Sequence, residues 1–396
     1  MSELLDRVSA VFPYTSALRR EFHQHPELGF QEYQTAEKIT RELSQWEGFS
    51  IQTGIAETGI VGTLSGGSPG KTVLVRFDMD ALPIREQTGA AYSSLNEGVM
   101  HGCGHDGHMA IGLTAARLLS ESRQDLAGKV VFLFQPAEEG LGGALRMISE
   151  GVLESSRPDF ALGLHLWNEK PLGWLGISNG PVMSASETFQ ILIRGKGGHG
   201  GKPHESVDPI VASASVISAI QSLPSREVHP LDSSVISFCN IQGGEAHNVI
   251  PEEVSLGGTI RTFTQETREL VLRRFQEIVN GVAQAHGCQA QITLTPISSA
   301  VQNHPEIAEA VRRTARSLFP ESNMDENYQT MASEDMAYIL ERIPGCYTFV
   351  GSANPEKGLD AKHHQPDFDF DEEALKTGVS LIVGAVNELL SLDFKL

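Results

Sequence analysis

Cysteine is scarce in this chain, and long apolar runs are missing. Four cysteines in 396 residues are too few and too widely spaced for a disulfide scaffold, and they suit a reducing compartment. No apolar run approaches the ~18 residues that a membrane-spanning helix needs. The segment 1–6 lacks the basic and apolar stretches of a signal peptide. We therefore expect a cytoplasmic protein without a membrane partner. The cysteines are Cys103, Cys239, Cys288 and Cys346.

Basic residues are also in short supply. Thirty lysines and arginines stand against 50 aspartates and glutamates, so the formal net charge is −20 at pH 7. An acidic surface repels phosphate backbones, which argues against a nucleic-acid partner. The hydrophobic fraction of 40% is ordinary for a globular protein. At about 150 residues per domain, the length predicts two to three domains.

Short apolar segments alternate with helical patterns through the first part of the chain. Residues 72–77 and 130–134 are apolar runs typical of strands that are covered on both faces. Residues 31–47 and 106–121 have apolar side chains at helical spacing. Asp106 is the expected N-cap of the second of these helices. This alternation predicts an α/β fold with helices on both sides of a sheet.

The middle of the chain has a different order of elements. Between 184 and 298, strand and helix patterns follow one another as β-α-β-β-α-β, the ferredoxin-like unit. We expect this segment to be a satellite domain inserted into an α/β domain made of 1–183 and 299–396, which ends in a helix at 372–391. The expected strands of the insert are 187–194, 234–241, 253–262 and 288–295, and its expected helices are 209–223 and 266–285.

The densest chemical signal lies at 100–108, Met-His-Gly-Cys-Gly-His-Asp-Gly-His. Three histidines, a cysteine and an aspartate occur within nine residues, and the glycines between them allow sharp turns. Thiolate and imidazole are ligands of zinc and of neighbouring transition metals. A structural zinc loop and a flexible histidine-rich turn are the alternatives, but no second cysteine pair completes a structural site. The segment predicts a catalytic metal site.

Carboxylates follow two of the expected strands. Glu138 and Glu139 come after the second apolar run, and Asp78 and Asp80 come after the first. In open α/β sheets, ligands bind at the carboxyl ends of the strands. One of two adjacent carboxylates can bind a metal while the other takes a proton from water, as a hydrolase requires. A solvated acidic turn, or a simple N-cap, is the alternative for these segments.

Other polar residues are less specific by themselves. His165 ends an apolar segment, and the pair His363-His364 precedes alternating acidic and aromatic residues, so each is a candidate for metal binding or for packing alone. Arg261 suits a carboxylate ligand, with a surface ion pair as its alternative. The glycine-rich turn 195–200 matches neither a phosphate-binding loop nor a dinucleotide fingerprint.

Six segments occur in an order that resembles a known family. They are DMDALP, MHGCGHDGHM, QPAEEG, GGHG-x-x-PH, HNVIP and MASED. Together they resemble the aminoacylase/carboxypeptidase clan of metallopeptidases, in the branch of hippurate hydrolase and the plant indole-acetyl-amino-acid hydrolases. The resemblance covers nearly the whole chain. It implies a two-metal amidohydrolase that cleaves the amide bond of N-acyl-L-amino acids to a carboxylic acid and a free amino acid.

The resemblance also implies roles for ten residues. Glu138 would be the general base and Asp80 would orient it. In the inserted lid or dimerisation domain, His199 would stabilise the tetrahedral oxyanion, often in the other subunit of a homodimer. Asn248 and Arg261 would hold the polar end of the substrate, with Arg261 on its free carboxylate. Two divalent ions, manganese or zinc first and cobalt or nickel otherwise, would be bound by Cys103, His105, Glu139, His165 and His364 rather than His363.

Two departures from the family pattern bear on the metals and on the substrate. Asp78 stands where many clan members have a histidine ligand, and Met336 stands where relatives often have phenylalanine, a change expected to reshape the acyl pocket. A dipeptidase or carboxypeptidase is the alternative within the clan. A metal-storage protein is disfavoured, because storage needs ligands and no general base such as Glu138. A zinc-stabilised interaction module lacks the second cysteine pair.

Overall fold

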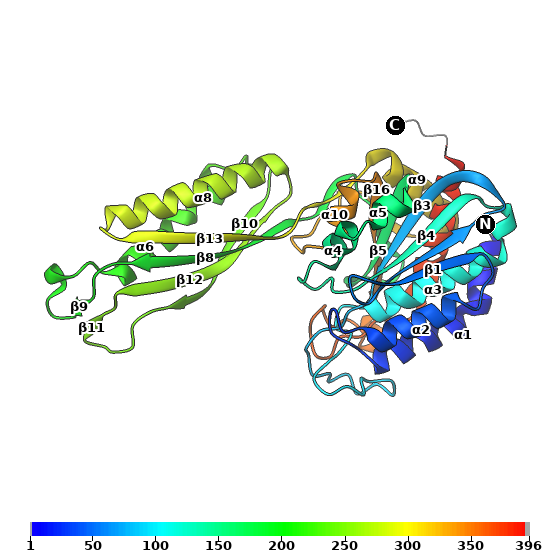
Figure 1. Cartoon of the computed structure of the whole chain (residues 1–396), viewed down its shortest axis with the longest axis horizontal. Helices are drawn as coiled ribbons and strands as arrows, with labels where there is room; N and C mark the ends of the chain where they lie inside the picture. Colours follow the sequence, from blue (N-terminus) through cyan, green and yellow to red (C-terminus); the bar gives the residue numbers. More distant parts are fainter. Residues whose placement is uncertain (1, 393–396) are drawn as a thin grey trace. The chain divides into compact units, whose positions relative to one another are not determined.

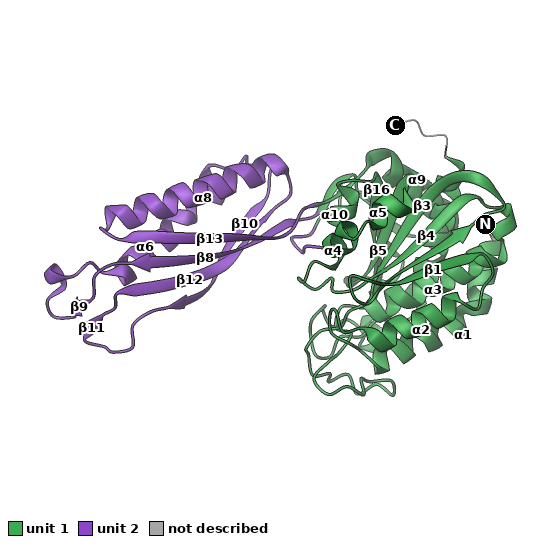
Figure 2. Cartoon of the chain, viewed as in Figure 1, with its two compact units in different colours: residues 1–182, 301–329, 335–396 green, residues 183–300, 330–334 purple. Residues whose placement is uncertain are grey.

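The computed structural model describes residues 2–392 and divides into two units. Unit 1 comprises Met1–Val182, Val301–Gln329 and Asp335–Leu396, and unit 2 comprises Met183–Ala300 and Thr330–Glu334 (Figure 2). The sequence of unit 2 thus interrupts that of unit 1, and each unit has its own hydrophobic core.

Unit 1 is built on an eight-stranded sheet whose strands, in their order across the sheet, are β1 (Phe49–Ile55), β2 (Gly59–Ser65), β4 (Ala127–Gln135), β3 (Ser68–Asp78), β5 (Phe160–Pro171), β16 (Gly345–Ala353), β6 (Trp174–Gly176) and β15 (Asn323–Asp325) (Figure 1). The central strands β4, β3, β5 and β16 are parallel to one another. Successive side chains of a strand point to opposite faces. Val73, Leu74 and Val75 are all fully buried, so both faces of β3 are covered.

The helices of unit 1 pack on this sheet and on one another. Three helices, α1 (Ser2–Gln24), α3 (His105–Glu121) and α11 (Glu373–Ser391), contact each other. Of these, α3 and α11 also contact β3 and β5. Short 3-10 helices of unit 1 lie at Arg123–Asp125 and Pro355–Lys357, and one of unit 2 lies at Pro203–Glu205. The helices of unit 1 are α1 (Ser2–Gln24), α2 (Tyr33–Leu43), α3 (His105–Glu121), α4 (Gly143–Ser149), α5 (Val152–Ser156), α9 (Pro305–Leu318), α10 (Ala337–Leu340) and α11 (Glu373–Ser391).

Unit 2 contains an antiparallel four-stranded sheet with the strands β10 (Ser234–Gln242), β12 (Glu253–Thr262), β8 (Ala185–Arg194) and β13 (Gln289–Ser298) in that order. The helices α6 (Pro209–Ile220) and α8 (Gln265–Ala285) pack on it, and α7 (Ser222–Arg226) follows α6. Along β8, Phe189, Ile191 and Ile193 alternate with more exposed residues and face the core. The order β8-α6-β10-β12-α8-β13 is the expected ferredoxin-like unit.

Two small strand pairs accompany the sheets. In unit 2, β9 (Gly198–His199) and β11 (Val249–Ile250) form an antiparallel two-stranded ribbon. The helices α6 and α7 and the strand β10 separate the two strands in the sequence. This β9–β11 ribbon is called the hairpin below, although no tight turn joins its strands. The second pair is β7 (Gly180–Met183) with β14 (Val301–Asn303). The hairpin was not expected from the sequence, because strands of two residues carry no alternation pattern.

The boundary between the units differs from the expected one by one residue at 183, by two residues at 299–300, and at one separate segment. Residues 330–334 group with unit 2, although the expected α/β domain included them. The reason is local hydrogen bonding. The hydroxyl of Ser184 donates to the carbonyls of Met331 and Ala332, at 2.9 and 3.3 Å, and Arg261 donates to the hydroxyl of Ser333 at 2.7 Å.

Two helices differ from the expected ones at their ends. The first, α2, is Tyr33–Leu43 and not 31–47, because Trp46 and Phe49 pack on the core from the turn and strand that follow the helix. In the second, α3, the N-cap is Gly104 and not Asp106. Asp106 lies inside the first turn, where its carboxylate has partners from another helix.

One described helix is long and apolar enough to cross a membrane. This helix, α11, has a mean hydropathy of 1.2 over its best window, and 67% of that window is buried inside the protein. A buried core helix passes the same test of length and composition, so the finding is weak evidence for a membrane span.

Candidate metal centre

Three neighbouring strands bring polar side chains to one edge of the sheet in unit 1. Asp80 lies just beyond the end of β3, and Glu138 and Glu139 lie just beyond the end of β4. His165 lies in β5, past the last residue of that strand that pairs with β3. The carboxyl ends of parallel strands are the place where open α/β sheets bind ligands.

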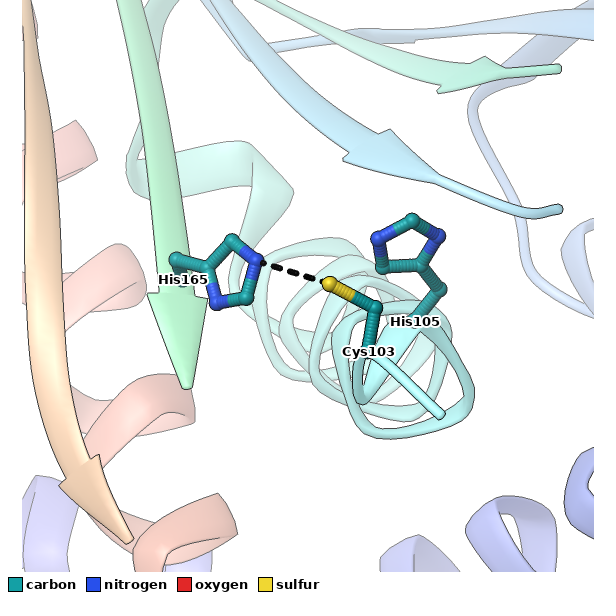
Figure 3. Close-up of side chains that lie close together, drawn as sticks. All are labelled: Cys103, His105 and His165. Carbon is teal, nitrogen blue, oxygen red and sulfur yellow. Dashed lines mark hydrogen bonds between the residues drawn. The ribbon is translucent and has the colours of Figure 1, made fainter. Parts of the chain in front are cut away.

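Cys103 and His105 come from the loop that leads into α3. Gly104 between them has a φ of +89°, a left-handed conformation that glycine adopts without a Cβ clash. This turn places the thiol and the imidazole beside each other, and Sγ of Cys103 lies 3.5 Å from Nε2 of His165 on β5 (Figure 3).

A hydrogen bond orients each of the two imidazoles. Nδ1 of His105 donates to the carbonyl of Asp80 at 2.8 Å, and Nδ1 of His165 donates to the carbonyl of Leu166 at 2.8 Å. When Nδ1 is the donor of a neutral ring, Nε2 keeps its lone pair for a metal. Nε2 of His105 is buried and has no hydrogen-bond partner among residues 2–392, so it is available as a ligand.

Glu139 and His364 lie at the same edge. Nε2 of His364 is 3.3 Å from Oε1 of Glu139, and the N–H of Glu139 donates to Oδ2 of Asp80 at 3.0 Å. His364 has a φ of +66°, and its N–H donates to the carbonyl of Gly102 at 2.8 Å. Gly102 belongs to the loop that carries Cys103 and leads into α3, called the metal loop below. The adjacent His363 instead donates from Nε2 to a backbone carbonyl of β5 at 2.9 Å.

The structure brings the five predicted ligands and the predicted base together. Their ligand atoms fall into overlapping groups of three, and within each group all atoms lie within 4.8 Å of one another. Sulfur, imidazole nitrogen and carboxylate oxygen form a donor set that suits first-row transition metals. The residues present therefore fit a dinuclear metal centre. The groups are Cys103, His105 and His165; Cys103, Glu139 and His364; and His105, Glu138 and Glu139.

Burial and carboxylates shift the pKa values of the ligands in different directions. Burial lowers the pKa of His165 well below its usual value. Burial raises the pKa of the Cys103 thiol well above its usual value, and the two neighbouring glutamates raise it further. Burial lowers the pKa of His105, but the carboxylates of Asp78 and Asp80 outweigh burial and raise it to about 10. A divalent ion would supply the charge that these carboxylates favour and would displace the protons from its ligands.

Asp78 and His108 are part of the centre. Both lie in segments that the sequence pattern singled out, but neither was among the ten residues given a role. Nδ1 of His108 donates to Oδ1 of Asp78 at 2.6 Å, and the N–H of Leu166 donates to Nε2 of His108 at 3.0 Å. The spacing of three residues from His105 to His108 places both rings on one face of α3, which is the signal that was available. The pair connects the metal loop to the strand that carries His165.

Arg76 binds Oδ2 of Asp78, the oxygen that also lies 3.7 Å from Nε2 of His105. Its guanidinium donates to Asp78 and Gln135 at 2.7 Å each and to Asp335 at 3.0 Å, and all four side chains are buried. Burial opposes the charge of Asp78, but two histidines and Arg76 outweigh burial and hold the pKa of Asp78 well below its usual value. Asp78 therefore stays charged.

A second network of buried charged side chains surrounds Asp106, which lies in the first turn of α3 directly after the metal loop. Asp106 accepts hydrogen bonds from Nε of Arg19 at 2.8 Å and from Nδ1 of His23 at 2.7 Å, both on α1. Arg19 also donates to Asp369 at 2.7 Å. The expected role of Asp106 as an N-cap is therefore wrong, because its carboxylate is engaged with α1.

In unit 2, His199 and Asn248 lie beside each other on the small hairpin. Val249 pairs with His199, and the carbonyl of Asn248 accepts the N–H of Gly200 at 2.8 Å. Both residues are exposed. Nδ1 of His199 accepts the N–H of Gly201 at 2.9 Å, so Nε2 carries the proton of a neutral ring. His199 thus offers an N–H donor to a ligand.

Arg261 lies at the other end of the sheet of unit 2. It pairs with Ser186 of β8, whereas the hairpin comes after Arg194, the last residue of that strand. The eight residue-to-residue steps from 186 to 194 extend over ~26 Å at about 3.3 Å each. Among the residues that the structure describes, Arg261 forms no ion pair and donates to the hydroxyl of Ser333. Within unit 2 the structure does not bring Arg261 together with the hairpin.

Met336 lies in the core of the protein. Its side chain is fully buried, and its terminal methyl lies 3.6 Å from the position that a Cβ would take at Gly163 of β5. The expected effect of Met336 on an acyl pocket stays a prediction.

Comparison with known proteins identifies relatives over most of the chain. Residues 74–388 match the family described as peptidase family M20/M25/M40. The chain is 38% identical over 358 residues to N-acetylcysteine deacetylase of Bacillus subtilis, which covers 90% of this chain and 92% of that protein. It is 37% identical over 375 residues to IAA-amino acid hydrolase ILR1-like 2 of Arabidopsis thaliana, covering 94% and 84%. It is 34% identical over 382 residues to thermostable carboxypeptidase 1 of Saccharolobus solfataricus, covering 96% of each.

A solved structure from Bacillus subtilis, described as a dinuclear metal binding peptidase from M20 family, has a similar fold. The TM-score is 0.84 at 33% sequence identity, and the match covers 96% of this chain and 99% of that chain. The similarity extends through both units, so the α/β fold with its satellite domain is shared with this relative.

Proposed function

Because the chain belongs to peptidase family M20/M25/M40, we propose that it is a two-metal amidohydrolase that cleaves N-acyl-L-amino acids to a carboxylic acid and a free amino acid. The observation that carries the proposal is the convergence of thiolate, imidazole and carboxylate groups at the strand ends of unit 1. A second carboxylate, Glu138, lies within reach of this cluster. Storage of a metal would need the ligands but not this additional base.

The metal ligands in this proposal are Cys103, His105, Glu139, His165 and His364. Three overlapping groups of ligand atoms support room for two ions, and the solved relative is described as dinuclear. Two divalent ions held there would lower the pKa of a water toward about 7 and polarise the amide carbonyl. Manganese or zinc suits the mixed donors, and cobalt or nickel is the alternative.

Glu138 is the group that moves the proton. Its side chain is only partly buried, so water and substrate reach its carboxylate. It takes a proton from the attacking water and passes the proton to the leaving amine, the two tasks of a general base and acid. Asp80 orients this turn because its Oδ2 accepts the N–H of Glu139 at 3.0 Å.

The hairpin of unit 2 acts in the active site of a second copy of the chain, which makes the enzyme a homodimer. The ~26 Å of β8 between Arg261 and the hairpin exceed the length of a small N-acyl amino acid, which supports this arrangement. Arg261 then binds the free carboxylate of the substrate. His199 of the partner subunit donates Nε2–H to the oxyanion, and Asn248 of the partner subunit binds the polar end of the substrate.

The acyl group is small or aromatic in this proposal, as in hippurate. Relatives whose names refer to N-acetylcysteine and to IAA-amino acid support this substrate class. A carboxypeptidase or dipeptidase is the second candidate, since one relative is named a carboxypeptidase. We place the enzyme in the cytoplasm, with neither nucleic acid nor membrane as partner, which the four free cysteines support.

The deciding experiment is hydrolysis of a panel of substrates by the full chain. N-acetyl, benzoyl and indole-acetyl amino acids and a few dipeptides are mixed with chelator-stripped protein, with and without added Mn²⁺ or Zn²⁺. We expect metal-dependent release of free amino acid, faster from the N-acyl amino acids than from the dipeptides. Faster cleavage of dipeptides would favour the second candidate. Absence of metal binding would overturn the ligand assignment.

A further inference from the structure

Glu32 is a buried carboxylate that the mechanism above does not use. It precedes α2 at the N-cap position, yet its side chain makes no capping hydrogen bond to that helix. Oε1 instead accepts the N–H of Ala137 at 2.9 Å, and Oε2 accepts the hydroxyl of Thr58 at 2.6 Å. A fully buried carboxylate needs such partners. One of them belongs to the turn that carries the two glutamates of the metal centre.

The chain before Glu32 lies directly against this turn. A Cβ added at Gly29 would lie 3.0 Å from the Cβ of Ala137 and 2.8 Å from a side-chain methyl of Leu141. A side chain at that position would require both Leu141 and Ala137 to shift, so the two segments are in close contact. The same segment contacts the residues after β3, because the N–H of Ala81 donates to the carbonyl of Glu27 at 2.8 Å. Residues 27–32 thus support two of the loops of the centre.

The turn needs such support because its backbone is unusual. Ala137 has a φ of +55°, a left-handed conformation that an alanine keeps only where its surroundings hold it. Two carboxylates bind the turn on either side of Glu138. Glu32 accepts the N–H of Ala137, and Asp80 accepts the N–H of Glu139. The backbone of Glu138 is therefore held at the residues immediately before and after it.

We propose that Glu32 is a positioning residue for the reaction: through the N–H of Ala137 it fixes the turn that presents Glu138 as base and Glu139 as ligand. This inference rests on the proposed function for the role of Glu138. Without the carboxylate, the N–H of Ala137 is left buried and unpaired. The turn then keeps its hydrogen bond to Asp80 and the one from the N–H of Gly143 to the carbonyl of Ala137, and it relaxes at the residue before Glu138. Ligand Glu139 and base Glu138 then leave their positions together.

The test compares three variants of the full-length protein. Glu32→Ala removes the anchor. Glu32→Gln keeps an oxygen that accepts the N–H of Ala137 and serves as the conservative rescue. Glu27→Ala is the matched control, because the Glu27 carboxylate is in the same segment but accepts hydrogen bonds from Gln34 and Thr35 of α2 and not from the turn. Affinity for Zn²⁺ alone is measured by competition with a chromophoric chelator, and kcat and KM are measured on the best panel substrate.

We expect Glu32→Ala to lower Zn²⁺ affinity and kcat by about 10- to 100-fold, the range for residues that support metal ligands, with KM within about twofold because the residues that bind the substrate are untouched. Glu32→Gln should recover most of both losses, and Glu27→Ala should retain wild-type values. Equal behaviour of Glu32→Ala and Glu27→Ala in both measurements would overturn the inference. If Glu32→Ala does not fold, Glu32→Asp, which withdraws the carboxylate by one methylene, takes its place.

The two proposals fail in different ways. If the wild type hydrolyses no substrate of the panel, the proposed function is wrong, and the Zn²⁺ measurement alone decides whether Glu32 positions Glu139. If the wild type is active and the affinity and kcat of Glu32→Ala are unchanged, only the role of Glu32 is wrong.

Discussion

The metal centre of unit 1 and the hairpin of unit 2 hold their polar side chains in opposite ways. His105 and His165 are 1% and 5% exposed, and each ring is oriented by a hydrogen bond from Nδ1. His199 and Asn248 are exposed, and their contacts come from the hairpin itself. A metal site gains affinity from ligands that are in place before the ion arrives. Residues that act on a substrate only after assembly can be left exposed until a partner covers them.

In the metal centre of unit 1, replacing the base Glu138 gives the largest expected loss of activity. Glu138→Gln should lower kcat by at least ~10²-fold, because the general base is removed while its shape is kept. The metal content should remain at the wild-type value, since Glu138 is not one of the five assigned ligands. Amino-acid release and elemental analysis measure the two quantities. A kcat close to wild type would remove Glu138 from its role, and a loss of metal would make it a ligand.

Replacing the exposed histidine tests the other side. His199→Ala should lower kcat by about 10²- to 10³-fold, as for the loss of one oxyanion donor. Metal content and melting temperature should not change, because the side chain is exposed. If His199 acts in the partner's site, co-expression with the metal-deficient variant Cys103→Ala should restore part of the activity in mixed dimers. No restoration would place His199 in the site of its own chain.

Removing Arg261 has a smaller expected effect that depends on the substrate. Arg261→Ala should lower kcat/KM by about 10- to 100-fold for substrates with a free carboxylate, because a hydrogen bond to a charged group contributes about 1.5–3 kcal/mol. Amidated substrates should change little. Arg194→Ala is the control, since this exposed arginine of the same sheet forms an ion pair with Glu253 at 3.4 Å on the surface. Equal losses on both kinds of substrate would show that Arg261 is structural.

The smallest expected effect is on the pH dependence of stability. Burial raises the pKa of Glu32 from 4.5 to about 7 in the folded protein. Between these values the folded state binds the extra proton, so the contribution of Glu32 to stability is complete below pH 4.5 and is lost as the pH rises through 7. Glutamine resembles the protonated form at every pH. The melting temperature of Glu32→Gln relative to wild type should therefore increase from pH 5 to pH 8, measured on metal-free protein. A constant difference would contradict the raised pKa.

The part of the fold and site that depends on local pattern was predictable from the sequence. The apolar runs 72–77 and 130–134 lie within the parallel strands β3 and β4. The rule that ligands bind at the carboxyl ends of such strands predicts that the carboxylates after them lie together. In the structure, Asp80 accepts the N–H of Glu139. The periodicity of unit 2 likewise predicted its four long strands and two main helices in the right order.

The supporting residues could not be predicted, because their partners are distant in the sequence. Arg19 meets Asp106 at a separation of 87 residues, and Glu32 meets Ala137 at a separation of 105 residues. A buried charge has the same appearance in a sequence as a solvated one, and only the tertiary fold brings it to its partner. The short hairpin and the grouping of 330–334 with unit 2 depend on non-local hydrogen bonds in the same way.

The length of β8 constrains how this protein can vary. The strand connects the end of the sheet that holds Arg261 with the end that is followed by His199. An insertion of one residue would reverse the facing of the strand on one side of the insertion and turn part of the row Phe189, Ile191 and Ile193 out of the core. A β-bulge can absorb such a residue, and the partner strand β13 already has an irregularity of this kind between Pro296 and Ser298. An insertion of two residues would keep the faces but lengthen the strand by about 6.6 Å. Even changes in the length of β8 thus preserve its core face, whereas odd changes require a bulge.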